Sequence, residues 1–190
     1  MDCDAMDNDA SVLKRLEDGN ALFRKNTDPS LLARLAQKNE PFVAILTCSD
    51  PRVVPEKIFN LSLGDAFVVR VAGNSASEPS VLGSLEYAVE HLHVRTLLVL
   101  GHTGCGAVRT AMEWKGPENL SKVIRDIDRA RGKVGDGLSN NPDAVAESNV
   151  KLQIRLIVDN SLTIMDAVNR GQLSVVGAMY NIATGAVRFV

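Results

Sequence analysis

The sequence predicts an α/β fold with a mainly parallel central sheet, an antiparallel edge strand, flanking helices and N-terminal helical arms. Short apolar runs alternate with stretches whose apolar residues recur at helical spacing, as in strands that helices cover on both faces. The last two apolar runs are separated only by residues 181–185, a length that suits a hairpin. The final strand should therefore pair antiparallel to the strand before it.

Length and composition are those of one ordinary soluble domain. The chain has 190 residues, of which 45% are apolar and 23% are charged. We expect a single domain over residues 1–190, with helical arms at about 10–38 and an α/β core at 42–190. The formal net charge of −2 gives no electrostatic reason to expect nucleic acid or membrane partners. The start of the chain lacks the features of a signal peptide, so we expect a cytoplasmic protein.

In the first half of the chain, helical periodicity comes before the first strand. Pro41 ends helical continuation, and the apolar run that follows it has the length of a buried strand. The expected elements in chain order are helices at 10–26 and 30–38, a strand at 42–46, a helical turn at 55–60, a strand at 66–71 and a loop at 73–77.

The second half of the chain repeats the alternation of strand and helix. Its clearest strand is the apolar run at 96–100, which leads into a glycine-rich turn and then a helix. The expected elements are a helix at 79–93, the strand at 96–100, helices at 107–114 and 120–131, a loop at 132–142, one long helix at 142–169, and strands at 173–180 and 186–190.

Two chemically distinctive segments follow predicted strands. Cys48 begins the segment 48–52, while His102 and Cys105 lie in the segment 101–106. In open parallel sheets, sites form beyond the carboxyl ends of strands where the strand order reverses. If the strands that precede these segments are neighbours, two thiolates and an imidazole face one crevice. Zinc prefers such ligands, and three protein ligands leave the fourth position open, as in catalytic sites.

A simpler interpretation of these three residues is two inert buried cysteines and a histidine that caps a turn. An odd cysteine count without a secretory signal argues against a disulfide framework. Cys3 lies in a polar terminal segment, and we treat it as a bystander.

Asp50 and Arg52 could form a functional pair beside the metal ligands. A guanidinium can bind a carboxylate through two parallel hydrogen bonds, which keeps the carboxylate ionised and fixed in direction. The simpler alternative is an exposed loop salt bridge, worth at most about 1 kcal/mol. Near a metal, Asp50 could accept a hydrogen bond from a zinc-bound water or occupy the fourth site itself. Because two thiolates cancel the formal charge of Zn²⁺, water activation needs such an acceptor.

The two segments match the C-x-D-x-R and H-x-x-C motifs of the β-class carbonic anhydrases, and the chain resembles that family over about residues 10–190. Further similar segments are 65–74, 83–89, 101–108 and 176–180. The resemblance implies zinc-dependent, reversible hydration of carbon dioxide to bicarbonate and a proton, by attack of zinc-bound hydroxide. It implies Cys48, His102 and Cys105 as metal ligands, and Asp50 and Arg52 as the catalytic dyad. It also implies a homodimer or dimer-based oligomer, in which the N-terminal arms reach over a partner subunit.

The resemblance also points to residues of a substrate cleft. Plant-type members of the family line this cleft with a Phe, a Tyr and a Gln; Phe67 and Tyr87 occupy the first two positions. The third falls on Asn39, or on Gln37 in another register. Another subgroup has a Trp where this chain has Ile45. We therefore expect an open site, with Asp50 paired to Arg52 and with water or a small anion on zinc at neutral pH.

Three alternatives compete with this interpretation. Carbonyl sulfide or carbon disulfide could be hydrolysed at the same zinc site, since some similar proteins act on these substrates. A non-catalytic scaffold would require loss of a ligand or dyad residue, and none is lost. A structural zinc site in a redox or regulatory protein would require a fourth protein ligand, for which Asp50 is the nearby candidate.

Overall fold

The computed structural model describes residues 9–114, 116–135 and 137–190. Cys3, which we treat as a bystander, lies outside the described residues. The chain divides after Asn39 into two compact units, Met1–Asn39 and Glu40–Val190, and each is described by itself. The metal-site residues all belong to the second unit.

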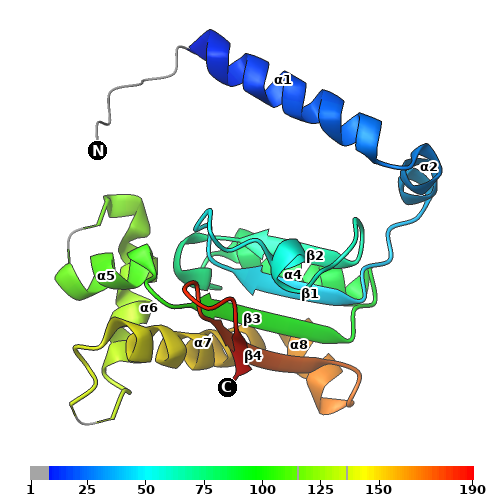
Figure 1. Cartoon of the computed structure of the whole chain (residues 1–190). Coiled ribbons are helices and arrows are strands. Elements are labelled where there is room, and N and C mark those ends of the chain that lie inside the picture. Colours follow the sequence, from blue (N-terminus) through cyan, green and yellow to red (C-terminus); the bar gives the residue numbers. More distant parts are fainter. Residues whose placement is uncertain (1–8, 115, 136) are drawn as a thin grey trace. The chain divides into compact units, whose positions relative to one another are not determined.

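In its described residues, the first unit contains two helices, α1 (Asp9–Asn26) and α2 (Pro29–Gln37), close to the predicted bounds (Figure 1). Asp28 caps α2, because its Oδ1 accepts a hydrogen bond from the Ser30 N–H at 2.8 Å. Several apolar side chains of α1 are exposed, namely Val12, Leu13, Leu16, Leu22 and Phe23. Within the described residues, no helix is both long and apolar enough to cross a membrane.

The second unit is built on a sheet that has five strands in the described part of the chain, in the order β2-β1-β3-β4-β5 (Figure 1). The three pairs β1–β2, β1–β3 and β3–β4 are parallel, and β5 pairs antiparallel to β4. This arrangement confirms the predicted fold class. The bounds are β1 Val43–Thr47, β2 Ala66–Arg70, β3 Thr96–His102, β4 Ser174–Tyr180 and β5 Val187–Phe189.

The strand order reverses at β1, which has β2 on one side and β3 on the other. Thr47, the last residue of β1, pairs with Leu100 near the end of β3. The segments that follow these two strands therefore leave the sheet side by side, at the kind of position where parallel sheets form their sites.

Helices cover one face of the sheet more extensively than the other. Ala44 and Leu46 on β1 pack into the large apolar cluster formed with the helices α4 to α8, whereas Val43 and Ile45 pack into a smaller cluster on the opposite face. The bounds are α3 Pro55–Ile58, α4 Pro79–Glu90, α5 Gly106–Glu113, α6 Ser121–Arg131, α7 Pro142–Asp159 and α8 Leu162–Asn169, with 3₁₀ turns at Ala72–Asn74 and Glu118–Leu120.

Helix α7 approaches β3 and β4 closely at two glycines. A Cβ on Gly101 would lie 2.5 Å from Val150 Cγ2, and one on Gly177 would lie 2.7 Å from Val150 Cγ1. Neither strand position has room for a side chain, because Val150 is fully buried and its β-branched side chain is stiff. The absence of a side chain at Gly101 and Gly177 therefore allows α7 to pack directly against the sheet, including β3, the strand that carries His102.

The prediction of one long helix at 142–169 was wrong. The chain forms α7 and α8, which are separated at Asn160 and Ser161. Ser161 starts α8 as its N-cap, since its Oγ accepts a hydrogen bond from the Ile164 N–H at 3.1 Å. The same hydroxyl donates to Glu86 Oε1 at 2.6 Å, so a contact with α4 helps to place the break.

Two smaller differences concern the segments beside the site. β3 was expected to end at Leu100, but it continues through Gly101 and His102, which pair with Met179 and Tyr180 of β4. The expected loop at 73–77 begins with a 3₁₀ turn in which Gly73 has φ of 64°. His102 thus belongs to the sheet itself.

Candidate metal centre

The turn that follows β1 is held by Asp50 and by a neighbouring strand. The Asp50 Oδ1 accepts a hydrogen bond from the Arg52 N–H at 3.0 Å. Arg70, the last residue of β2, donates from Nη2 to the Asp50 carbonyl at 2.8 Å and from Nε to the Cys48 carbonyl at 3.4 Å. These contacts order the backbone that carries both Cys48 and Asp50. Sequence reasoning did not predict this role for Arg70.

The turn that follows β3 joins the other two candidate ligands. His102 is the last residue of β3, and Cys105 is the N-cap residue of α5. Between them, Gly104 has φ of +65°, a conformation that glycine adopts without steric cost. The Thr103 N–H donates to the Tyr180 carbonyl at 3.0 Å and ties the turn to the end of β4.

The structure brings Cys48, His102 and Cys105 together in a group that could hold a metal ion. Their ligand atoms lie within 4.8 Å of one another, and all three residues are buried. The two sulfurs are 3.9 Å apart. Ligands of a tetrahedral zinc ion are on the order of 3.5 Å apart, so a small closure of the group suffices.

The histidine of this group is oriented as a metal ligand requires. His102 Nδ1 lies 3.0 Å from the Thr103 carbonyl, and with the proton on Nδ1 it donates to that oxygen. The buried Nε2 has no hydrogen-bond partner among the described residues. A buried acceptor without a donor is costly, and a metal ion in this position would satisfy it. The donor set therefore fits a metal better than it fits a turn-capping histidine beside inert cysteines.

The pKa values of the two thiols are shifted in opposite directions. The contact between the two sulfurs lowers the pKa of Cys48 to about 4, although burial opposes this change. The same contact, together with burial, raises the pKa of Cys105 well above its ordinary value. Burial lowers the pKa of His102, but the Cys48 sulfur, the Thr103 carbonyl and the Asp50 carboxylate together outweigh that effect and raise it overall. A metal ion would have to displace the Cys105 proton in order to bind both sulfurs.

Asp50 and Arg52 form the two-point ion pair that the sequence suggested. Arg52 Nε donates to Asp50 Oδ1 at 2.9 Å and Nη2 donates to Oδ2 at 2.7 Å. These hydrogen bonds hold the pKa of Asp50 far below its usual range, so the carboxylate is ionised at neutral pH. The side chain of Asp50 is only 11% exposed, whereas that of Arg52 is 55% exposed. Arg52 Nη2 also lies 3.4 Å from the Gly104 carbonyl and so links the two turns.

Two of the three predicted cleft residues lie together. The ring centroids of Phe67 on β2 and Tyr87 on α4 are 6.1 Å apart. Tyr87 is also 5.1 Å from the ring of His91, between ring centroids, so this histidine packs on an aromatic side chain. Asn39 belongs to the first unit, so its place in the cleft stays a prediction.

Sequence reasoning missed two buried polar residues of α7. Asn149 Nδ2 donates to the Gly73 carbonyl at 2.9 Å, and Gln153 Oε1 accepts from the Ala76 N–H at 2.8 Å. The pair is joined by a hydrogen bond from Gln153 Nε2 to Asn149 Oδ1 at 3.1 Å. This pair orders the segment after β2, where the Gly73 backbone helps to lower the pKa of Cys48. The sequence signal was present as two amides four residues apart among the apolar residues of a helix.

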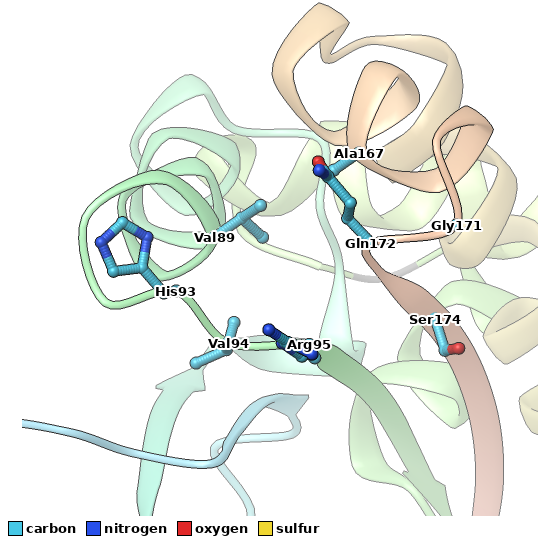
Figure 2. A pocket seen from close by; sticks show the side chains of 8 residues that line it. All are labelled: Val89, His93, Val94, Arg95, Ala167, Gly171, Gln172 and Ser174. Atoms are coloured by element: carbon cyan, nitrogen blue, oxygen red, sulfur yellow. The ribbon is translucent and has the colours of Figure 1, made fainter.

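A cavity of about 570 Å³ lies away from this group, at the amino ends of β3 and β4 (Figure 2). It is lined by Val89, His93, Val94, Arg95, Ala167, Gly171, Gln172 and Ser174. The candidate metal ligands follow the carboxyl ends of β1 and β3, so this cavity belongs to the opposite edge of the sheet.

Comparisons with known proteins agree with the fold and the ligand group. A model of the carbonic anhydrase family matches residues 43–187. Carbonic anhydrase 2 of Mycobacterium tuberculosis is 35% identical over 190 residues, which cover 94% of this chain and 91% of that protein. The resemblance that the motifs predicted is therefore confirmed.

Solved structures show the same fold. A β-carbonic anhydrase of Coccomyxa, solved in complex with acetazolamide, matches with 30% identity and a TM-score of 0.79, over 95% of this chain and 85% of that chain. A β-carbonic anhydrase from a study of two tetrameric enzymes of the ascomycete Sordaria macrospora matches with 25% identity and a TM-score of 0.82, over 95% of this chain and 97% of that chain. Similarity of this extent, in sequence and in fold, shows that the chain is an enzyme of the carbonic anhydrase family, and that it belongs to the β class.

Proposed function

We propose that this protein is a zinc-dependent carbonic anhydrase that interconverts carbon dioxide and bicarbonate. The observation that carries the proposal is the buried group of two sulfurs and one imidazole nitrogen beside a carboxylate that an arginine holds in place. Zinc in that group would supply Lewis acidity, which lowers the pKa of a water molecule enough to make it a nucleophile at neutral pH.

The choice of zinc follows from the donor set. Two thiolates and one imidazole are ligands that zinc prefers, and three protein ligands are usual in catalytic zinc sites. In the described part of the chain the group comprises Cys48, His102 and Cys105, while Asp50 is engaged by Arg52. This engagement favours an open fourth position over a structural site closed by Asp50.

We assign Asp50 the task of orienting the attacking water. Because it is ionised, its carboxylate can accept a hydrogen bond from the water and direct an oxygen lone pair toward the carbon of the substrate. Arg52 fixes the direction of this carboxylate through both of its oxygens. Two thiolates cancel the formal charge of Zn²⁺. The pair therefore provides the orientation of the water molecule that the metal does not provide by itself.

The substrate cleft is proposed to include Phe67, Tyr87 and Asn39. Carbon dioxide is apolar, and the aromatic pair offers it a surface that water does not compete for strongly. The Asn39 amide, or that of Gln37, would donate a hydrogen bond to bicarbonate.

Assembly and location are part of the same proposal. We propose a homodimer or dimer-based oligomer, because the exposed apolar side chains of α1 need a surface to cover them. Solved relatives of the chain include tetramers. We also propose a cytoplasmic location.

Stopped-flow hydration of carbon dioxide tests the proposal, with the zinc-loaded enzyme and a Cys105→Ser variant measured side by side. We expect the native enzyme to bind zinc and hydrate carbon dioxide, and the variant to lose both properties. Cys3→Ser controls for the removal of a thiol and should change neither. Carbonyl sulfide and carbon disulfide are assayed in parallel. If either sulfur compound is turned over faster than carbon dioxide, that compound is the preferred substrate and the proposal of carbon dioxide is wrong.

A further inference from the structure

We propose that Asp143 is a positioning residue for His102, acting through the peptide group that joins Thr103 to Gly104. The inference concerns a carboxylate on α7 that has no place in the sequence motifs. It rests on the proposed metal-dependent function, because its consequence is the orientation of a metal ligand.

The contact that carries the inference is direct. The Gly104 N–H donates to Asp143 Oδ1 at 2.8 Å, between residues 39 positions apart in the sequence. Gly104 lies between the two ligands His102 and Cys105, and its φ of +65° permits the tight turn between them. A side-chain carboxylate of α7 therefore holds the middle of the ligand-bearing turn.

The same peptide group also contacts His102. The N–H of Gly104 and the carbonyl of Thr103 are the two ends of one planar peptide unit. Asp143 accepts from the N–H end, and His102 Nδ1 lies 3.0 Å from the carbonyl end. The carboxylate, the peptide and the imidazole thus form a row. Because Nδ1 of His102 contacts the peptide, Nε2 is the nitrogen that remains available to bind the metal.

This row has two physical consequences. A carboxylate that accepts from the N–H end polarises the peptide and makes its carbonyl a stronger acceptor. A stronger hydrogen bond at Nδ1 fixes the tautomer of His102 and makes Nε2 a better ligand, as carboxylates that contact metal-binding histidines directly do. The carboxylate also stops rotation of the peptide beside Gly104, whose backbone is otherwise the most permissive in the turn.

The backbone that carries Asp143 is fixed at the start of α7, and the residue itself is exposed. It lies in the first turn of α7, where Asn141 Oδ1 accepts hydrogen bonds from the N–H groups of Asp143 at 3.0 Å and Ala144 at 3.3 Å. A negative charge is favourable at this end of a helix. The helix packs onto β3 and β4 through the buried Val150 at Gly101 and Gly177, so its position relative to the sheet is well defined.

Other contacts anchor the flanks of the turn, and Arg52 Nη2 lies 3.4 Å from the Gly104 carbonyl, whereas the N–H end of the Thr103–Gly104 peptide is held by Asp143. The Thr103 N–H donates to the Tyr180 carbonyl at 3.0 Å, and Thr103 Oγ1 accepts from the Ile182 N–H at 3.1 Å. Loss of the Asp143 carboxylate should therefore leave the turn attached to β4 but free to rotate at the Thr103–Gly104 peptide. The expected defect lies in ligand orientation, with little effect on folding.

The test compares Asp143→Ala and Asp143→Asn with a matched control, Glu147→Gln. Asn keeps an oxygen that can accept from the Gly104 N–H, whereas Ala does not. Glu147 lies one helical turn further along α7 and forms ion pairs with Lys151 and Arg188. It is therefore an acidic residue of the same helix whose ion-pair partners lie outside the turn at residues 102–105. Zinc affinity is measured by competition with a chromophoric chelator, and hydrogen exchange at the Gly104 amide is measured by NMR on the zinc-free proteins.

We expect Asp143→Ala to weaken zinc binding by about 10–100-fold, the usual effect of removing a group that orients a ligand. The Gly104 amide should exchange at least 10-fold faster in this variant. Asp143→Asn should retain affinity within about threefold of the native protein, and so should Glu147→Gln. Thermal unfolding of the zinc-free proteins shows whether Asp143→Ala remains folded.

Unchanged zinc affinity in Asp143→Ala, or equal losses in Asp143→Ala and Asp143→Asn, would overturn the inference. Native exchange at Gly104 in Asp143→Ala would also overturn it, and this measurement needs no metal. A native protein that binds zinc but does not hydrate carbon dioxide would contradict the proposed function instead, and the affinity comparison would still decide the role of Asp143.

Discussion

Arg52 holds both carboxylate oxygens of Asp50, from Nε to Oδ1 at 2.9 Å and from Nη2 to Oδ2 at 2.7 Å. Movement of Asp50 toward the metal ligands would break two charge-assisted hydrogen bonds, which are about twice as strong as neutral ones. This relationship favours Asp50 as an acceptor beside the metal over Asp50 as a ligand of the metal.

Replacing Asp50 with Asn should lower the rate of carbon dioxide hydration by about 10–100-fold, the usual effect of losing a hydrogen-bonding group that orients the surroundings of a metal. Zinc should stay bound, because Cys48, His102 and Cys105 are unchanged. The measurement is stopped-flow hydration together with zinc content per chain. Asp65→Asn is the matched control, since Asp65 accepts a hydrogen bond from the Ser62 N–H at 2.7 Å within its own turn. Full turnover in Asp50→Asn with zinc bound would exclude this role for Asp50.

Replacing Gly177 with Ala should lower the free energy of unfolding by about 1–3 kcal/mol, because the new methyl group overpacks the interface between β4 and α7. Its Cβ would lie 2.7 Å from Val150 Cγ1 and 2.9 Å from Ile154 Cδ1. Gly83→Ala is the control, since a Cβ at that helical position has no neighbour within 4 Å. This second change should raise the free energy of unfolding by about 0.5–1 kcal/mol. Urea unfolding measures both, and equal stability of the two variants would contradict the described packing.

Replacing Glu147 with Gln should lower the free energy of unfolding at pH 7 by at most about 1 kcal/mol, the usual value of a solvent-accessible ion pair. Lys151 and Arg188 lower the pKa of Glu147 from its ordinary value of 4.5. The folded protein therefore binds the proton less readily than the unfolded chain, and the stabilising effect is complete above pH 4.5.

As the pH falls below that value, Glu147 becomes protonated. The difference in the free energy of unfolding between the native protein and Glu147→Gln then disappears. Urea unfolding of both proteins from pH 7 to pH 3.5 measures the difference. A difference that grows as the pH falls would contradict the assignment of these ion pairs.

Local sequence information was sufficient for most of the sheet and for the grouping of the metal ligands. β1 is a continuous apolar run because both of its faces are buried, and such runs identify strands of parallel sheets. Once β1 and β3 are adjacent, their carboxyl ends place Cys48 beside His102 and Cys105. That adjacency was an assumption at the sequence level, because strand order depends on contacts between distant segments.

The elements that could not be predicted depend on partners far away in the sequence. Gly101 has a weak preference for strands, but its pairing with Met179 extends β3 to His102. Ser161 is compatible with a helix interior, and its N-cap role follows from the position of α8 and the contact with Glu86. Asp143 resembles an ordinary acidic residue in a first helical turn until the fold brings Gly104 to it.

The central claim is that hydration of carbon dioxide depends on one zinc ion held by Cys48, His102 and Cys105. The most direct measurement is a titration of the zinc-free enzyme with Zn²⁺, in which bound metal and stopped-flow hydration rate are recorded on the same samples. We predict that the rate rises in proportion to bound zinc and stops rising at one zinc per chain. A full hydration rate before zinc is added, or a rate that stays at the uncatalysed level with one zinc bound per chain, would contradict the claim.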